Sequence, residues 1–303
     1  MQAVVYEEFG GPEVLQVREF DEPHAGPGEV RIAVRAAGVN PFDFKVRRGY
    51  MQPNLPAALP AVPGYEVAGV VDEVGEGVTD FVVGDEVVGW SKTGGYAAHA
   101  VAGAIAKKPA EVSFEEAVTL PVAGETSVRA LRELGLKEGE TLLVHGAAGG
   151  VGVVGVQLAV ALGATVIGTA SEANHEYLRS LGVIPVLYGE GLVDRVRAVA
   201  PQGIDAVYDV AGKGALPDSI ELRGGTDRVL TVADPTAADH GIPFSMGTGD
   251  PVEQAADLRA QLQLAAEGKL QLKVAETFAL TDVVKAVEIS EGGHVSGKLV
   301  LKP

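Results

Sequence analysis

The 303-residue sequence has no cysteine, and this absence excludes disulfide bonds, cysteine-ligated zinc, iron–sulfur clusters and thiolate catalysis. Positive charge is also scarce: 24 lysines and arginines stand against 41 aspartates and glutamates, so the formal net charge is −17. A surface of that sign repels the phosphates of nucleic acids and anionic lipid headgroups. We therefore expect no nucleic-acid partner.

The sequence also lacks an obvious targeting signal and an uninterrupted membrane span. Its start, MQAVVYEEFG, has no basic segment followed by an apolar run, so we expect neither a signal nor a transit peptide and a cytoplasmic location. Residues 142–171 contain no charged side chain, and a membrane span needs about 20 predominantly apolar residues. Several glycines and Gln157 interrupt this stretch. We therefore expect no membrane span, and a buried core element or a nucleotide-binding turn in its place.

The hydrophobic pattern divides the chain into two kinds of structure. Up to about Glu115, short β-like runs such as EVRIAVRAAGV and EVAGVVDEVG alternate with Pro and Gly, which predicts an antiparallel barrel or sandwich. From about Leu120, apolar strands alternate with turns and helices, which predicts a parallel sheet with right-handed crossovers. The closing elements, with a helix expected to begin at Thr281, could rejoin the first half.

A glycine-rich turn stands in the middle of the uncharged stretch. TLLVHG predicts a strand, AAGGVG a turn and VVGVQLAVALG a helix, and a second strand follows at ATVIGTA. This is the order of a dinucleotide-binding unit. Gly149 would let the backbone approach a pyrophosphate, and Gly152 would let the helix pack near the strand. Many glycine-rich turns merely connect elements, but the flanking strand, helix and strand favour cofactor binding.

The end of the second strand bears on which cofactor is bound. NAD-binding units usually carry an Asp or Glu there for the ribose 2′-hydroxyl, whereas this strand ends Thr169-Ala170-Ser171. The missing carboxylate favours NADP, whose 2′-phosphate could accept hydrogen bonds from Ser171 and Asn174. No Lys or Arg stands beside them in the sequence, and Glu172 keeps NAD possible. Helix N-capping is the alternative role for Ser171 or Asn174.

Three stretches resemble the quinone oxidoreductase, or ζ-crystallin-like, branch of the medium-chain dehydrogenase/reductase superfamily. They are AAGVNPFDFKVRRG at 36–49, VPGYEVAGVVDEVGEGV at 62–78 and GETLLVHGAAGGVGVVGVQLA at 139–159. The resemblance implies an α/β protein in which a GroES-like β-rich catalytic domain and a Rossmann doubly wound sheet border a cleft. The corresponding division is a GroES-like domain at 1–118, a Rossmann domain at 119–255 and a C-terminal return at 256–303.

The same resemblance argues against a zinc enzyme. Zinc-dependent alcohol dehydrogenases of this superfamily carry metal ligands at positions that correspond here to Asn40, Tyr65 and Ala123, none of which is a strong zinc ligand. The implied activity is zinc-independent hydride transfer from NADPH to a quinone or an activated alkene, such as an α,β-unsaturated carbonyl, because conjugation stabilises the charge that develops on these acceptors.

The resemblance places Asn40 and Asp43 near the nicotinamide ribose and the substrate. Lys45, two positions later, could lie on the same strand face or helical turn and supply a positive donor. Tyr50 and Tyr65 could donate phenolic hydrogen bonds to the acceptor oxygen, and Tyr65 is the stronger candidate because it replaces a metal ligand. For Asn40, Asp43 and Lys45 the alternative roles are a turn-forming Asn-Pro pair, a helix cap and a solvated surface charge. For the two tyrosines the alternative is packing of the ring.

By the same resemblance, cofactor contacts fall on the glycine turn, on the ends of the following strands and on the helix that links the domains. The expected NADP(H)-binding residues are Asn40, Thr126, Ala148, Gly149, Gly150, Val151, Gly152, Ser171, Asn174, Tyr188, Ala211, Val232, Ala233, Phe244, Ser245 and Met246.

Two other functions remain open from the sequence: an NADP(H)-binding protein with a structural or sensing role, and an enoyl-thioester reductase. Members of the family commonly pair their nucleotide domains through an edge strand. The segment IPFSMGT could be that strand, which predicts a homodimer. Such an edge could equally be covered within one chain.

Overall fold

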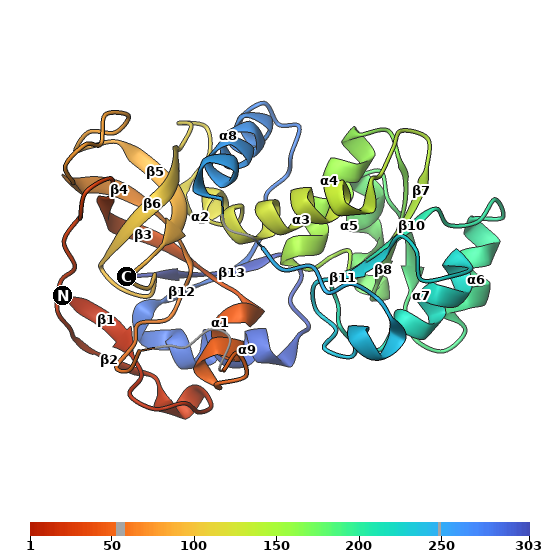
Figure 1. Ribbon diagram of the computed structural model, residues 1–303, viewed down its shortest axis with the longest axis horizontal. Helices are drawn as coiled ribbons and strands as arrows, with labels where there is room; N and C mark the ends of the chain where they lie inside the picture. The colour runs from red at the N-terminus through yellow and green to blue at the C-terminus, as the bar shows by residue number, and fades with distance from the viewer. Residues whose placement is uncertain (53–57, 248–249) are drawn as a thin grey trace. The chain divides into compact units, whose positions relative to one another are not determined.

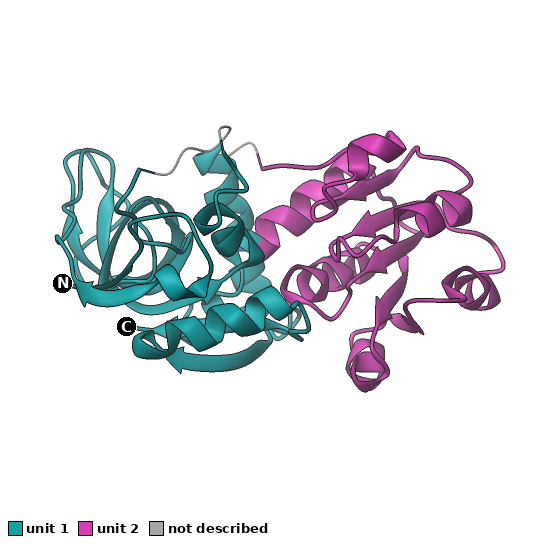
Figure 2. Cartoon of the chain, turned by 90° about the horizontal axis from the view of Figure 1, so that it is seen from below, with its two compact units in different colours: residues 1–122, 250–303 teal, residues 123–249 magenta. Residues whose placement is uncertain are grey.

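The computed structural model describes residues 1–52, 58–247 and 250–303. The chain forms two compact units, shown in teal and magenta in Figure 2: unit 1 comprises Met1–Val122 and Asp250–Pro303, and unit 2 comprises Ala123–Gly249. The divisions expected after 118 and after 255 fall close to these bounds, the second of them inside a helix that belongs to unit 1.

Unit 1 is built on a six-stranded sheet in which neighbouring strands run β12-β13-β3-β4-β5-β6. An additional pairing between β3 and β6 closes β3, β4, β5 and β6 on themselves, and these pairings are antiparallel, as the sequence predicts for this half. A two-stranded antiparallel sheet accompanies it. The strands are β1 (Gln2–Val5), β2 (Gln16–Glu19), β3 (Val30–Val39), β4 (Glu66–Val74), β5 (Glu86–Ser91), β6 (His99–Lys107), β12 (Val274–Ala279) and β13 (Lys298–Lys302).

The C-terminal strands of the chain belong to this same sheet. Strand β13 pairs antiparallel with β3, and β12 pairs parallel with β13. The helices assigned to unit 1 are α1 (Pro41–Arg47), α2 (Phe114–Ala117), α8 (Pro251–Ala266) and α9 (Val283–Gly292). Helix α9 follows a 3-10 turn at Leu280–Asp282, so the helix expected to begin at Thr281 begins at Val283. A core of Val, Ile, Leu and Ala side chains from β3, β4, α9 and β13 holds these distant segments together.

Unit 2 contains a five-stranded sheet in the order β11-β10-β7-β8-β9, and every pairing in it is parallel (Figure 1). Its strands are β7 (Thr141–His145), β8 (Thr165–Ala170), β9 (Ile184–Leu187), β10 (Ala206–Asp209) and β11 (Val229–Thr231). Helix α3 (Pro121–Leu134) enters the unit, and α4 (Gly150–Ala161), α5 (His175–Ser180), α6 (Leu192–Val199) and α7 (Leu216–Arg223) follow. The expected α/β fold with a Rossmann sheet is confirmed.

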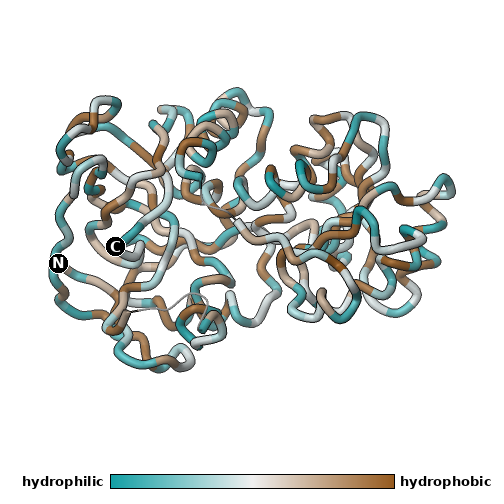
Figure 3. Tube along the Cα trace, viewed as in Figure 1, coloured by the Kyte–Doolittle hydropathy of each residue, from teal (hydrophilic) through white to brown (hydrophobic). Residues whose placement is uncertain are grey.

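Burial on both faces explains why residues 142–171 carry no charge. Leu142 and Val144 pack with helices α3, α4 and α5, whereas Leu143 between them packs with α6 and α7. Parallel sheets covered by helices on both faces read as continuous apolar runs. Figure 3 shows hydrophobic stretches along these strands and more hydrophilic ones along the surrounding loops. No helix in the described ranges has the length and apolar character needed to cross a membrane.

The turn between β7 and α4 depends on glycine at two positions. Gly146 has a φ of +77°, in the left-handed region that glycine adopts at no steric cost. A Cβ at Gly152 would lie 2.2 Å from the carbonyl oxygen of Gly146, so only hydrogen leaves room for the helix against the turn. At Gly149, by contrast, the closest atom to a Cβ would be the same oxygen at 3.4 Å.

The segment IPFSMGT, expected to form an edge strand, makes only an isolated β-bridge within the described residues. It makes one parallel bridge, Thr231 to Phe244, and the amide of Ser245 donates to the Thr231 carbonyl at 2.9 Å. Strand β11 thus has this segment along its outer side. The homodimer and the cytoplasmic location stay predictions.

A buried ion pair joins strand β4 to strand β13 inside unit 1. Lys298 Nζ lies 2.6 Å from Glu66 Oε1, and the two side chains are 5% and 0% exposed. Glu66 Oε2 also accepts a hydrogen bond from the backbone amide of Val122 at 2.9 Å. Each charge therefore depends on the other, because an unpaired buried ion carries a large desolvation penalty.

The contrast between the two glycines of the turn predicts different effects on stability. Gly152→Ala should lower the free energy of unfolding by about 2 kcal/mol, since overpacking a fixed backbone contact typically costs about 1–3 kcal/mol. The matched substitution Gly149→Ala should cost less than about 1 kcal/mol, the range for a helix N-cap change. Urea denaturation measures both, and equal losses would show that Gly152 is not sterically constrained.

The buried ion pair predicts non-additive mutational effects. Glu66→Gln and Lys298→Met should each lower the free energy of unfolding by about 3–5 kcal/mol, because each leaves one charge buried without its partner. The double variant should lose less than the sum, since it removes both charges. A double-mutant cycle by urea denaturation tests this, and additive losses would contradict the coupling.

Candidate functional site

Asn40 directly follows strand β3 and is the N-cap of helix α1, with Pro41 as the first helical residue. The Asn-Pro pair therefore starts a helix, as one of the alternative roles suggests. Its side chain is directed to the buried ion pair: Nδ2 donates to Glu66 Oε1 at 2.8 Å, and Oδ1 accepts from Lys298 Nζ at 2.5 Å. Both ends of the amide are thus held in one orientation, and the backbone amide of Asn40 is capped by Asp43.

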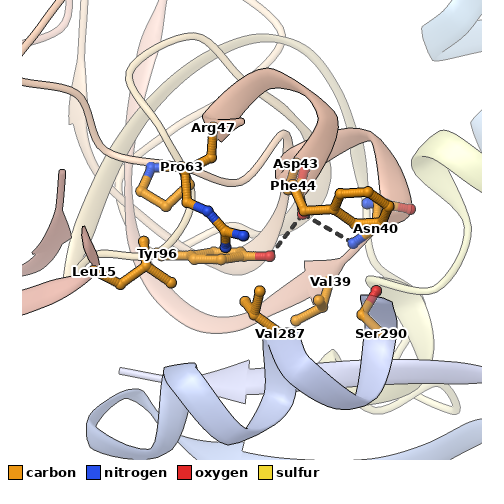
Figure 4. Close-up of a pocket in the computed structure, with 10 residues that line it drawn as sticks. All are labelled: Leu15, Val39, Asn40, Asp43, Phe44, Arg47, Pro63, Tyr96, Val287 and Ser290. Atoms are coloured by element: carbon orange, nitrogen blue, oxygen red, sulfur yellow. Dashed lines mark hydrogen bonds between the residues drawn. The ribbon is translucent and has the colours of Figure 1, made fainter. Parts of the chain in front are cut away.

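Asp43 is 4% exposed and lies one helical turn after Asn40 (Figure 4). Its Oδ2 accepts the Asn40 amide at 2.8 Å and the Tyr96 hydroxyl at 2.6 Å. Oδ1 is buried and has no hydrogen-bond partner among the described residues. Burial raises the pKa of Asp43 to about 7, although the hydrogen bonds from Tyr96 and Asn40 lower it. This carboxyl group can therefore hold or release a proton near neutral pH.

Tyr65 and Asp43 both line a pocket of about 280 Å³ in unit 1. Burial raises the pKa of Tyr65 to about 12, so its hydroxyl keeps its proton and can donate a hydrogen bond. The Tyr65 ring also packs against Phe42, with 4.9 Å between ring centroids. Ring packing and a polar role are therefore compatible at this position. Other lining residues include Tyr6, Phe20, Val46, Pro60, Pro63, Ser91 and Lys92.

Lys45 and Tyr50 do not lie with these two residues. Lys45 shares a helical turn with Asp43, but two positions on an α-helix differ by about 200°, so the side chains leave opposite sides of α1. Burial lowers the pKa of Lys45. Tyr50 is 67% exposed. Neither is among the described residues that line the pocket.

In unit 2, the expected cofactor residues come together because the strands are parallel. Residues 147–152 follow β7, Ser171 follows β8, Ala211 lies two residues past β10, and Val232 and Ala233 follow β11. From β7 the chain proceeds outward through β8 and β9, then returns to β10 on the other side of β7. The crevice outside the carboxyl ends of strands at such a reversal is where doubly wound folds bind ligands.

Helix α4 presents its N-terminus at this reversal. Its N-cap is Gly149, and its first intrahelical bond runs from the Val153 amide to the Gly149 carbonyl at 2.9 Å. The amides of Gly150, Val151 and Gly152 precede that bond and lie at the positive end of the helix dipole. Ala148 continues the turn and is buried. Such an arrangement suits a pyrophosphate.

A buried carboxylate shapes the loops after β10 and β11. Asp209 Oδ1 accepts the amides of Ala211 at 3.0 Å and Gly212 at 3.2 Å, and Oδ2 accepts the Thr231 hydroxyl at 2.7 Å. The Thr231 hydroxyl in turn accepts the Ala233 amide at 3.1 Å. The expected contact residues Ala211 and Ala233 are therefore held by one hydrogen-bond network.

Ser171 and Asn174 occupy N-cap positions, but neither side chain makes a cap hydrogen bond. Asn174 Nδ2 donates instead to Ser171 Oγ at 3.0 Å. Glu172 between them is exposed. Tyr188, expected near the adenosine phosphate, follows β9 directly and is 51% exposed. The alternative role of helix N-capping is therefore correct for the position of these two residues, but their side chains do not make the hydrogen bond that such a cap requires.

The remaining expected contacts lie near helix α3. The carbonyl of Thr126 accepts the Tyr208 hydroxyl at 3.4 Å. Ser245 is buried and accepts a hydrogen bond from Arg129, which also pairs with Glu125 at 2.8 Å. Its neighbours Phe244 and Met246 are 42% and 58% exposed. Arg129 thus ties this segment to α3.

Several polar residues of this arrangement were absent from the sequence-based set. They include Glu66, Tyr96, Arg129, Asp209, Thr231 and Lys298. The one local signal was the position of Glu66 and Lys298 directly before apolar strand residues, where a buried charge needs a partner. No group of three or more His, Asp or Glu side chains in residues 1–52, 58–247 and 250–303 is placed to hold a metal ion.

Comparisons with known proteins agree with this architecture. Residues 26–126 match the family described as alcohol dehydrogenase GroES-like domain, and residues 181–301 match the family described as zinc-binding dehydrogenase. The chain is 32% identical to a human quinone oxidoreductase over 99% of this chain and 97% of that one. It is 34% identical to the tomato (Solanum lycopersicum) 2-methylene-furan-3-one reductase over 100% of this chain and 79% of that one.

Among solved structures, the Escherichia coli quinone oxidoreductase complexed with NADPH superposes with a TM-score of 0.89 at 28% identity, over the full length of both chains. Sequence and structure thus agree across both units. The chain belongs to the quinone oxidoreductase branch of the medium-chain dehydrogenase/reductase superfamily.

Proposed function

We propose that this protein is an NADPH-dependent, zinc-independent oxidoreductase that transfers hydride to a quinone or an activated alkene. The observation that carries the proposal is the glycine turn at the strand-order reversal, where a Cβ at Gly149 would meet no atom closer than 3.4 Å and the first amides of α4 have no intrahelical acceptor. The NADPH complex of the E. coli relative supports the choice of cofactor. When bound, NADPH supplies the hydride.

The residues of unit 2 would bind and orient the cofactor. The amides of Gly150, Val151 and Gly152 would donate to the pyrophosphate, with Gly149 allowing its approach. The loops organised by Asp209 would flank the adenosine and the nicotinamide ribose. Rigid loops matter here because hydride transfer requires the reacting carbons to be held within a short distance.

The residues of unit 1 would manage charge and protons at the acceptor. Tyr65 can donate a hydrogen bond to an oxygen on which negative charge develops, a contribution that grows as the reaction proceeds. Asp43 lines the same pocket and can supply a proton, because its carboxyl group titrates near neutral pH. Asn40, fixed by Glu66 and Lys298, holds Asp43 in place through its backbone amide.

Both quinones and activated alkenes are proposed as acceptors because relatives of both kinds match this chain. The human relative is named a quinone oxidoreductase and the tomato relative a 2-methylene-furan-3-one reductase. Both acceptors delocalise charge onto an oxygen, and the aromatic and proline walls of the unit 1 pocket suit a flat, conjugated molecule.

Tyr65 provides the first test of this proposal. Purified protein should oxidise NADPH stoichiometrically with at least one acceptor from a panel of 1,4-quinones, enals, enones and an enoyl thioester, followed by absorbance at 340 nm. Tyr65→Phe should lower kcat about 100- to 1,000-fold, as expected when one donor to a developing oxyanion is lost. The half-buried Tyr177 of unit 2 offers a matched control, and Tyr177→Phe should keep the wild-type rate. Absence of turnover with every acceptor would disprove the proposed activity.

Asp43 predicts the pH dependence of catalysis. Its pKa is raised to about 7, so the protonated fraction falls as pH rises through that value. If Asp43 donates the proton, kcat/KM should be constant below about pH 6 and fall about tenfold per unit well above pH 7. Asp43→Asn should lower the plateau and remove this titration. A falling limb that persists unchanged in Asp43→Asn would assign the proton to another group.

A further inference from the structure

Arg195 stands in the first turn of helix α6 and binds the loop that leaves strand β9. Its Nε donates to the Leu187 carbonyl at 3.0 Å, and Nη1 donates to the Glu190 carbonyl at 2.8 Å. Its Nη2 lies 3.3 Å from the Tyr188 carbonyl and 3.1 Å from the Gly189 carbonyl. Four successive carbonyls thus fix the plane of one guanidinium group.

These acceptors leave the positive charge of Arg195 without an opposite charge. Backbone carbonyls are dipoles, and no carboxylate of the described residues forms an ion pair with this guanidinium. Arg197 on the same helix differs, because its Nη2 lies 2.9 Å from Glu221. Arg223 and Arg228 likewise pair with Asp227 and Glu140. In a chain with a net charge of −17, a guanidinium held in place without a carboxylate is suited to bind an anion.

The sheet brings this guanidinium to the edge where the adenosine end of a dinucleotide is expected. Strands β8 and β9 pair in parallel with Ala170 opposite Leu187. The chain after Ala170 and the chain after Leu187 therefore leave neighbouring strands at the same edge of the sheet. The first carries Ser171 and Asn174, and the second carries Tyr188 and the carbonyls that hold Arg195.

We propose that Arg195 recognises the 2′-phosphate of NADPH, an inference that rests on the proposed function. Strand β8 ends without the carboxylate that would bind a 2′-hydroxyl and without a basic residue of its own. Arg195 supplies the missing charge from helix α6, whose first turn binds the loop after the neighbouring strand. An arginine has five N–H groups, so one N–H and the full charge remain for phosphate oxygens after the four carbonyl contacts. Ser171, directly after the paired strand β8, and Tyr188, in the loop that Arg195 binds, carry further neutral donors.

The test compares two nucleotides that differ by this one phosphate. Isothermal titration calorimetry on the full-length protein would measure the Kd of adenosine 2′,5′-bisphosphate and of adenosine 5′-monophosphate. Arg195→Gln should raise the Kd of the bisphosphate about tenfold or more, the effect of losing a charged hydrogen bond, and change that of the monophosphate less than twofold. Arg195→Lys should recover part of the preference. Arg197→Gln, on the same helix, should leave both values unchanged.

Equal weakening of both nucleotides by Arg195→Gln would show that the side chain only holds the loop, and no change in either would show that it does not reach the phosphate. Each result overturns the proposal. If Arg195→Gln fails to fold, the wild-type preference for the bisphosphate should still collapse between 0.05 and 1 M salt, because screening weakens exposed charge pairs; a salt-independent preference would also overturn it. Calorimetry needs no electron acceptor. A protein that prefers the bisphosphate but oxidises NADPH with no acceptor would therefore contradict the proposed activity and leave the role of Arg195 standing.

Discussion

The pairing of Glu66 with Lys298 is the constraint around which unit 1 is arranged. Both charges are withdrawn from water, so each must be satisfied inside the protein. Lys298 comes from the last strand of the chain and Glu66 from β4, and Asn40 at the end of β3 bonds to both. Through Asn40 the pair reaches Asp43, whose carboxyl caps the first turn of α1. One ion pair thereby links the C-terminal strand to the residues that line the pocket.

The same network explains the chemical character of Asp43. Its Oδ2 receives two hydrogen bonds that favour the ionised form, whereas the burial of Oδ1 without a partner among the described residues favours the protonated form. Burial is the larger effect, and the pKa rises to about 7. Burial also raises the pKa of Tyr65 in the same pocket, to about 12, so its hydroxyl stays protonated and remains a hydrogen-bond donor throughout the physiological pH range. A titrating carboxyl and a permanent donor thus share one pocket.

Unit 2 depends on a different constraint, the common direction of its strands. Five parallel strands bring five loops to one edge of the sheet, and the reversal of strand order beside β7 opens space there. Three separate features fix the backbone of the loops at that edge: the glycine turn, the Asp209 network and the contacts of Arg195 with the loop after β9. The Asp209 network and Arg195 satisfy polar backbone groups that would otherwise need solvent.

The sequence by itself determined the class of each unit, the glycine turn, the absence of cysteine chemistry and the family. These follow from local patterns: the period of apolar residues, the order strand, turn, helix, and motifs a few residues long. It also placed Asn40, Asp43 and Tyr65 among the candidates for the site. It ranked Tyr65 above Tyr50 only through the family resemblance, and it could not separate Asp43 from Lys45, because only the helix and the pocket direct those two side chains differently. Tertiary structure alone decided the partners of Asn40, which come from positions 66 and 298, and the binding of the loop after β9 by an arginine from position 195. Contacts between residues so far apart in the chain are set by strand pairing and shared burial, and neither can be read from a short segment.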